Sequence, residues 1–123
     1  MRAIVVDDSR TMRTLLRSVL REAGVEVVAE AENGRDALAA LAKLGPVELM
    51  LLDWNMPVMN GYELLLEVRA NQRMASMRLM MVTTETEATQ ILRALEAGAD
   101  EYLIKPFSRQ AIREKLELMG LFE

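Results

Sequence analysis

Any chemistry of this 123-residue chain must rest on carboxylates, hydroxyls, lysine and arginine, because the sequence has no histidine and no cysteine. These absences exclude an imidazole general base, a Ser–His–Asp triad, a zinc site of the usual kind, a disulfide framework and a histidine phosphoacceptor. Four polar groups each follow a short apolar run: Asp7-Asp8, Asp53-Trp54-Asn55, Thr83-Thr84-Glu85 and Lys105-Pro106-Phe107. Side chains of these types suit a divalent cation and phosphoryl transfer, provided that the fold brings them together.

The elements that position these groups alternate along the chain. Apolar and β-branched runs predict five buried strands: Ala3–Val6, Glu26–Ala31, Val47–Leu52, Leu79–Val82 and Tyr102–Ile104. Apolar residues spaced three and four apart predict helices between them: from Met12 to Ala23, from Ala37 to Ala42, from about Gly61 to Ala70, from Ala88 to Ala97, and after Ser108. Gly24 and Gly98 are expected to end helices, and Asn33-Gly34 is expected to form a turn.

Five strands alternating with five helices predict one α/β domain, residues 1–123, with a parallel sheet covered on both faces. Such a doubly wound (βα)5 sheet binds ligands at the carboxyl ends of its strands, where all four polar groups stand. Three carboxylates, a hydroxyl and one ammonium are therefore expected to converge. Like charges about 4 Å apart repel by about 4 kcal/mol at an effective dielectric constant of 20. Lys105 neutralises one carboxylate, and a hard divalent ion is expected to neutralise the rest.

The composition is that of a globular protein outside membranes. Apolar residues make up 51% of the chain and charged residues 28%, and no apolar run approaches the roughly 20 residues of a membrane span. The first apolar stretch, Ala3–Val6, is too short for a signal peptide, so we expect a cytoplasmic protein that begins at Met1. A net charge of -4 argues against nonspecific binding to nucleic acid.

Five blocks of sequence occur in order at the predicted strand ends: Leu51–Pro57, Asn60-Gly61 with Glu63–Leu65, Met81–Thr83, Ala97–Ala99, and Tyr102 with Lys105–Phe107. Together they make the whole chain resemble the receiver domain of two-component response regulators. Within that family it resembles the stand-alone chemotaxis regulators of the CheY type. The resemblance implies the flavodoxin-like, CheY-like fold with strand order 2-1-3-4-5.

The resemblance also assigns a phosphoacceptor and a cofactor. Asp53 resembles the residue that takes the phosphoryl group, with Mg²⁺ as the cofactor. The side chains of Asp8 and Asp53 would hold the ion directly, Asp7 would hold it through a water, and Asn55 would contribute its backbone carbonyl.

Further roles follow from the same resemblance. Thr83 would hydrogen-bond the acquired phosphoryl group and Lys105 would pair with it. The Lys105-Pro106 peptide bond is expected to be cis. Tyr102 would be the rotating aromatic that reports the movement of Thr83, although a residue of this type also serves as a packing residue. Asn55 and Glu85 flank the acceptor where the family tunes dephosphorylation, which suggests a short-lived phosphoryl state.

As a function, the resemblance implies a regulatory switch rather than an enzyme, one that catalyses only its own phosphorylation and dephosphorylation. The expected partners are a CheA-like sensor histidine kinase and a protein target on the outer face of the last two βα units, with a phosphatase as a further candidate. The segment Glu85–Ala88 is acidic where well-studied chemotaxis relatives are basic. A single-domain receiver in a non-chemotaxis phosphorelay is therefore an alternative.

Two other classes of protein use similar residues or the same architecture. A magnesium-dependent phosphatase with an aspartate nucleophile usually carries a second acid two residues later. That position is Asn55, which transfers no proton. A flavin- or nucleotide-binding module would have a glycine-rich turn after the first strand, where Asp7-Asp8-Ser9 stands. Four arginines fall on the exposed side of the first helix and are interpreted as a solvated face: Arg10, Arg13, Arg17 and Arg21.

Overall fold

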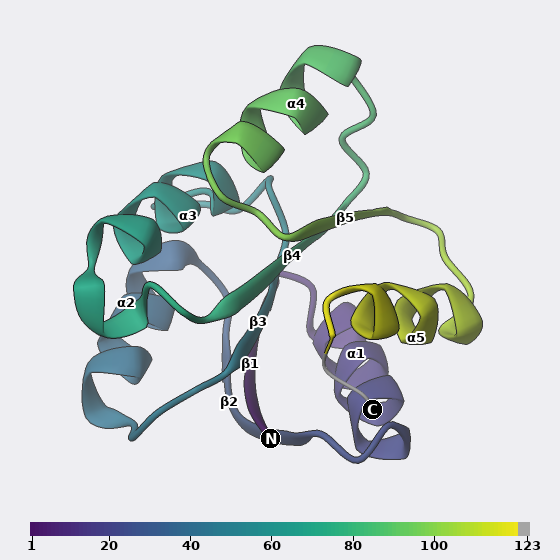
Figure 1. The fold of residues 1–123 in the computed structure, drawn as a ribbon, viewed down its shortest axis with the longest axis horizontal. Helices are drawn as coiled ribbons and strands as arrows, with labels where there is room; N and C mark the ends of the chain where they lie inside the picture. Colours follow the sequence, from purple (N-terminus) through teal and green to yellow (C-terminus); the bar gives the residue numbers. More distant parts are fainter. Residues whose placement is uncertain (121–123) are drawn as a thin grey trace.

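The computed structural model describes residues 1–120, so the last three residues of the predicted domain 1–123 lie outside the described part. Strands and helices alternate as the sequence predicts (Figure 1). The strands are β1 (Arg2–Val6), β2 (Glu26–Ala31), β3 (Leu49–Leu52), β4 (Arg78–Thr83) and β5 (Glu101–Ile104). The helices are α1 (Arg10–Glu22), α2 (Gly34–Lys43), α3 (Gly61–Ala70), α4 (Ala88–Glu96) and α5 (Arg109–Leu118), with a short 3-10 turn at Gln72–Met74 that was not predicted.

The sheet has the order β2-β1-β3-β4-β5, and every neighbouring pair is parallel, which confirms the expected topology. Its register aligns the ends of the strands that carry the polar groups. Val6 at the end of β1 pairs with Leu52 at the end of β3, so Asp7 and Asp53 leave the sheet side by side. Thr83 pairs with Ile104, which places Lys105 beside the end of β4.

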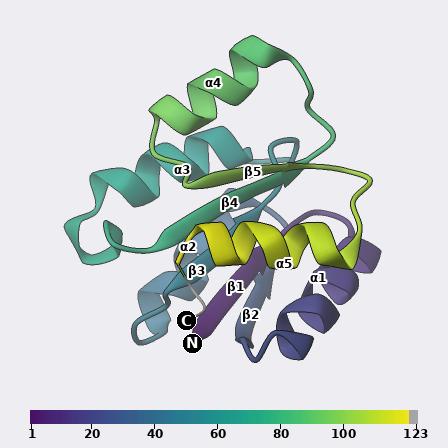
Figure 2. The same cartoon turned by 45° about the vertical axis from the view of Figure 1, so that its right-hand side comes forward.

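Two apolar cores lie on opposite faces of the sheet, because successive strand residues point to alternate sides. Helices α1 and α5 cover one face, and α2, α3 and α4 cover the other (Figure 2). In β3, for example, Leu49 and Leu51 pack toward α1 and α5, whereas Met50 and Leu52 pack toward the other three helices. A strand buried on both faces is apolar throughout, and β3 is fully buried along its length.

Local differences from the sequence predictions are small. Strand β3 begins at Leu49 rather than at position 47. The expected turn at Asn33-Gly34 is instead the start of α2: the Asn33 side chain accepts a hydrogen bond from the Asp36 backbone N–H at 2.8 Å, and Gly34 is the first helical residue. Asparagine favours turns and helix N-caps for the same reason, since its side-chain oxygen binds nearby backbone N–H groups. Among the described residues, no helix has the length and apolar character needed to cross a membrane.

Candidate functional site

Three carboxylates meet where β1 and β3 end. Asp7, Asp8 and Asp53 each offer an oxygen, and these three atoms lie within 4.8 Å of one another. Asp7 and Asp53 are buried, whereas Asp8 is exposed. The cluster predicted from the strand ends is therefore present, and it is open to solvent on the side of Asp8.

Lys105 joins this cluster from the end of β5. Its ammonium donates to Asp7 Oδ2 at 2.8 Å and to Asp53 Oδ2 at 3.0 Å. Burial disfavours the charged lysine, but the bonds to Asp7 and Asp53 outweigh that effect and raise the pKa of Lys105. The ammonium therefore stays charged across the physiological range. The Lys105-Pro106 bond is cis, as expected.

Asp7 is the most constrained of the three acids. Its Oδ1 accepts from the backbone N–H of Ser9 at 2.8 Å, and its own N–H donates to the Ala31 carbonyl at 3.0 Å. Burial raises the pKa of Asp7, and it outweighs the opposing effects of Lys105 and Ser9. The folded chain therefore holds the proton on Asp7 more tightly than a free aspartate does, and a bound cation would favour the ionised form.

The loop after Asp53 is held by its backbone. Asp53 Oδ1 accepts from the Trp54 N–H at 2.7 Å, and the Trp54 carbonyl accepts from the Gly61 N–H at 2.8 Å. A Cβ atom at Gly61 would lie 1.9 Å from the Asp53 carbonyl oxygen, so only glycine allows α3 to begin this close to the acid. Asn55 follows with an exposed side chain. The Asn60-Gly61 pair is visible in the sequence, but its contact with Asp53 is not.

Thr83, Glu85 and Tyr102 form a second group beside the acids. Thr83 is fully buried, and its hydroxyl accepts from the Glu85 N–H at 3.2 Å. The Tyr102 hydroxyl donates to the Glu85 carbonyl at 3.0 Å, and the residue is 8% exposed. Burial, reinforced by Glu85 and Asp53, raises the pKa of Tyr102 to about 12. The Glu85 carboxylate accepts from the Glu87 N–H, so it lies along its own loop.

The donor set fits a magnesium ion. Three carboxylates and one ammonium leave two uncompensated negative charges, which a divalent cation balances. Oxygen ligands about 2.1 Å from an octahedral Mg²⁺ lie about 3 Å apart in neighbouring positions and about 4.2 Å apart in opposite ones. The Asp8 and Asp53 oxygens lie within 4.8 Å of each other, so small shifts would meet that spacing, while Asp7, expected to act through a water, need not meet it.

Comparison with known proteins places this chain in a family. The family model for the response regulator receiver domain matches residues 3–117. The chain belongs to the receiver-domain family. Receiver domains are regulatory switches that bind Mg²⁺ at an acidic pocket, and this chain has a cluster of three aspartates. This membership confirms the family and the fold that the sequence blocks predicted.

Among curated relatives of this receiver domain, the chemotaxis protein CheY homolog of Campylobacter jejuni is 44% identical over 117 residues, covering 95% of this chain and 90% of the relative. The CheY4 structure of Vibrio cholerae superposes with a TM-score of 0.85 at 34% identity, covering 94% of this chain and 95% of that one. A Borrelia burgdorferi CheX–CheY complex with BeF3 and magnesium shares the fold, with a TM-score of 0.91 at 20% identity, covering 100% of this chain and 90% of that one.

The structure corrects one interpretation of the receiver's first helix. Arg10, Arg17 and Arg21 are exposed as expected, but the Arg13 side chain is only 15% exposed and contacts the acid loop. Helical spacing identified the face correctly. It did not indicate that one arginine on its edge turns back toward β1.

Proposed function

We propose that this receiver domain is a chemotaxis response regulator that accepts a phosphoryl group on Asp53 from a CheA-like sensor histidine kinase. The observation that carries the proposal is the pairing of Asp53 with Lys105 inside a cluster of three carboxylates. A carboxylate oxygen of Asp53 forms a bond to phosphorus while the phosphorus–nitrogen bond of the donor phosphohistidine breaks, and the leaving imidazole takes a proton. The product is an acyl phosphate.

The surrounding groups have distinct roles in this proposal. Asp8 and Asp53 hold Mg²⁺ by side chain, Asp7 holds it through a water, and Asn55 contributes its backbone carbonyl. The ion supplies charge neutralisation for the phosphoryl oxygens. Lys105 pairs with the new phosphoryl group, which adds negative charge beside an ammonium already held in place.

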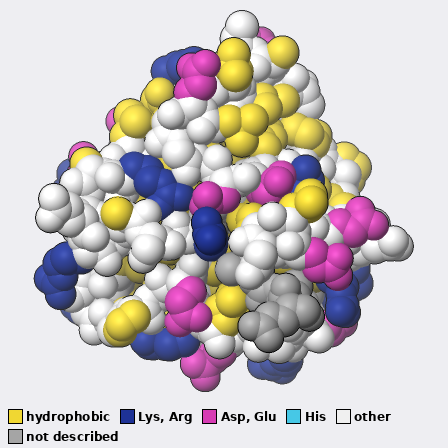
Figure 3. Space-filling view, in the orientation of Figure 1, with side chains coloured by type: hydrophobic (Ala, Val, Ile, Leu, Met, Phe, Trp, Pro, Cys, Tyr) yellow, Lys and Arg dark blue, Asp and Glu magenta, His cyan; other side chains and the backbone are white. Residues whose placement is uncertain are grey.

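The proposed output begins with Thr83. Its hydroxyl turns to the phosphoryl group, the loop of Glu85 moves with it, and Tyr102 loses or changes its bond to the Glu85 carbonyl. The target then binds over α4, β5 and α5. Leu92 and Leu95 on α4 are exposed apolar side chains, and Figure 3 shows apolar side chains gathered beside α4. The names of the curated relatives favour a chemotaxis target.

A non-chemotaxis phosphorelay is the second candidate. It is favoured by the acidic residues Glu85 and Glu87 just before α4, where a basic surface would be expected in well-studied chemotaxis relatives. In either pathway the protein works in the cytoplasm with its kinase, and a phosphatase is a further partner. In this proposal the protein catalyses only its own phosphorylation and dephosphorylation and turns over no other substrate.

Trp54 makes the central proposal testable. It is the sole tryptophan, is 6% exposed, adjoins Asp53 and stacks on Tyr62 with ring centroids 5.2 Å apart. We expect millimolar Mg²⁺ to change its fluorescence, and a small-molecule phosphodonor such as acetyl phosphate to change it further. Asp53→Asn should lose the second change, and phosphorylated protein should gain one phosphoryl mass. Wild type that takes up no phosphoryl group would refute the proposal.

The lifetime of the phosphoryl state is a separate prediction. A water oxygen bonds to phosphorus while the bond from phosphorus to Asp53 breaks, releasing inorganic phosphate and the free carboxylate. Asn55 and Glu85 flank this site and orient the water, so Glu85→Ala combined with Asn55→Ala should slow decay by about 100-fold, the lower end of the range for side chains that assist proton transfer. Decay is followed from released phosphate after the donor is removed. Equal decay in wild type and variant would contradict the assignment.

A further inference from the structure

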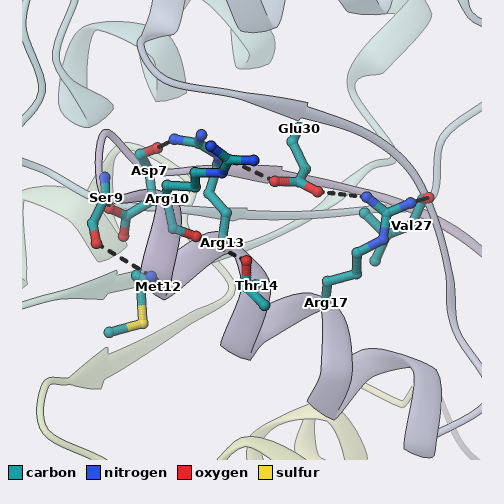
Figure 4. Close-up of polar contacts among 9 residues, drawn as sticks. All are labelled: Asp7, Ser9, Arg10, Met12, Arg13, Thr14, Arg17, Val27 and Glu30. Atoms are coloured by element: carbon teal, nitrogen blue, oxygen red, sulfur yellow. Dashed lines mark hydrogen bonds and ion pairs between the residues drawn. The ribbon is translucent and has the colours of Figure 1, made fainter.

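Arg13 connects the first turn of α1 to the loop that carries the acids. Its Nη1 donates to the Asp7 carbonyl oxygen at 2.7 Å, and its Nε donates to Glu30 Oε1 at 3.1 Å (Figure 4). The Arg13 side chain is 15% exposed, and that of Glu30 is 27% exposed. The two contacts lie on opposite sides of one planar guanidinium, so together they fix its orientation.

The bond to the Asp7 carbonyl sets where Asp8 begins. The peptide group between Asp7 and Asp8 is planar, so holding its oxygen also fixes the Asp8 nitrogen and Cα. The Asp7 carboxylate has its own partners, Ser9 and Lys105. Within residues 1–120, the Asp8 carboxylate has no hydrogen-bond or ion-pair partner. Its place among the three acids therefore depends on the backbone that Arg13 holds.

Glu30 determines what Arg13 can contact. Arg17 donates to the second carboxylate oxygen of Glu30 and, at 3.4 Å, to the Val27 carbonyl, so Glu30 of β2 is held between two arginines of α1 (Figure 4). A guanidinium released from Glu30 would lie near three carboxylates and could bind one of them through two parallel hydrogen bonds. Such a bond would neutralise the charge that attracts a cation.

We propose that Arg13 is a positioning residue for the cation site, acting through the Asp7–Asp8 peptide, and that Glu30 keeps its guanidinium away from the carboxylates. The inference rests on the proposed magnesium site and adds two residues to it. Neither residue touches the ion or the phosphoryl group. Their effect is on the affinity for Mg²⁺, which is measured without any phosphorylation.

The test is a Mg²⁺ titration of Trp54 fluorescence in Arg13→Met, with Arg17→Met as the matched control. Arg13→Met should weaken Mg²⁺ binding about tenfold, the lower end of the range for residues that orient metal ligands. Simple electrostatics predicts the opposite sign, because loss of a nearby positive charge strengthens cation binding. Arg17→Met removes the same charge without touching the Asp7 carbonyl, and should bind Mg²⁺ as wild type or slightly tighter.

A double-mutant cycle separates positioning from a general loss of structure. Glu30→Gln alone should weaken Mg²⁺ binding several-fold, because it frees Arg13 to pair with the acids. In the Arg13→Met background the same change should alter affinity by less than about twofold. Should Glu30→Gln have its full effect there, Glu30 does not act through Arg13 and the proposal is overturned.

Mg²⁺ binding by wild type and by Arg13→Met separates a failure of the positioning role from a failure of the cation site itself. If wild type binds Mg²⁺ and Arg13→Met binds it equally well, the cation site stands and the positioning role is overturned. If wild type shows no binding, both are overturned. Should Arg13→Met unfold, Arg13→Lys replaces it, because lysine keeps the charge but cannot span both acceptors, and several-fold weaker Mg²⁺ binding is expected.

Discussion

At the scale of single residues, burial and neighbouring charges together set the pKa values of the site residues. Asp7 is 1% exposed and its pKa is raised, while the pKa of Lys105 is raised by the carboxylates that it contacts. Lys105 therefore contributes stability that is present below pH 10.5 and is lost as the pH rises through its higher folded pKa. The pKa of Asp7 is raised as well, but here the charged form is the one that costs stability: the cost develops as the pH rises from 3.8 through the folded pKa and persists at neutral pH.

Replacing Asp7 should stabilise the metal-free protein. Asp7→Asn removes a buried charge while Lys105 keeps Asp53 as a partner, so at pH 7 we expect about 1 kcal/mol more stability, the usual size of a point-mutation effect. Because the folded pKa of Asp7 lies above 3.8, the gain is full above that folded pKa and shrinks as the pH falls toward 3.8. Urea unfolding across pH measures it.

Glu67→Gln is the control for this prediction. It removes the same formal charge from an exposed position on α3. Its effect should stay within about 0.5 kcal/mol at every pH, as for most surface substitutions. A similar pH profile for both variants would mean that net charge, rather than burial of Asp7, sets the stability.

At the scale of elements, the start of α3 positions the phosphoacceptor loop. Asn60 caps the helix, accepting from the Glu63 N–H at 2.8 Å, while the Glu63 side chain accepts from the Asn60 N–H at 3.0 Å. Behind that cap, Gly61 bonds to Trp54 and lies against the Asp53 carbonyl. Tyr62 stacks on Trp54, and the Arg93 guanidinium of α4 lies 4.5 Å from the Tyr62 ring centroid. The loop is thus tied to α3 and, through Tyr62, to α4.

Gly61→Ala should therefore damage both stability and the site. The added Cβ meets backbone rather than a flexible side chain, so we expect about 3 kcal/mol of destabilisation, the upper end for overpacking, and a weaker Trp54 response to Mg²⁺. Chemical unfolding and Mg²⁺ titration measure the two effects. Gly45→Ala is the matched control, since its Cβ meets only the end of the Arg2 side chain at 3.2 Å. Equal behaviour of the two variants would contradict the role of Gly61.

At the scale of the whole molecule, the site lies at the carboxyl ends of the parallel strands, and an apolar core covers each face of the sheet. The acids come from the ends of β1 and β3, so a cation that they share ties these two strands together, while the Lys105 ammonium at the end of β5 is bound by two of the same acids. A ligand that binds only the folded state stabilises the entire domain, whichever element it contacts.

Magnesium should therefore raise the melting temperature of the whole domain. At a Mg²⁺ concentration ten times the dissociation constant the gain is about 1.4 kcal/mol. For a domain of this size that corresponds to a rise of about 5 °C. Asp8→Asn should lose most of the rise, and sodium chloride at matched ionic strength should not reproduce it. An equal rise with sodium chloride would indicate screening instead of a bound ion.

The sequence by itself determined the alternation of elements and the residues at the strand ends. Both depend on local pattern: apolar runs such as those of β1 and β3 form strands buried on both faces, and Ser108 caps a helix through a side chain three residues from its partner. It also supplied the blocks that identified the family. The strand order came from that resemblance and not from the pattern.

Only the tertiary structure decided which groups touch. The bond between Lys105 and Asp7 joins residues 98 positions apart, and no local pattern specifies such a contact. It depends on strand order and register, which are set by packing across the whole sheet. The same holds for Gly61 against Asp53 and for Arg13 against the Asp7 carbonyl. A glycine at the start of a helix or an arginine in its first turn does not reveal a distant contact in the sequence, and only the folded backbone brings each residue to its partner.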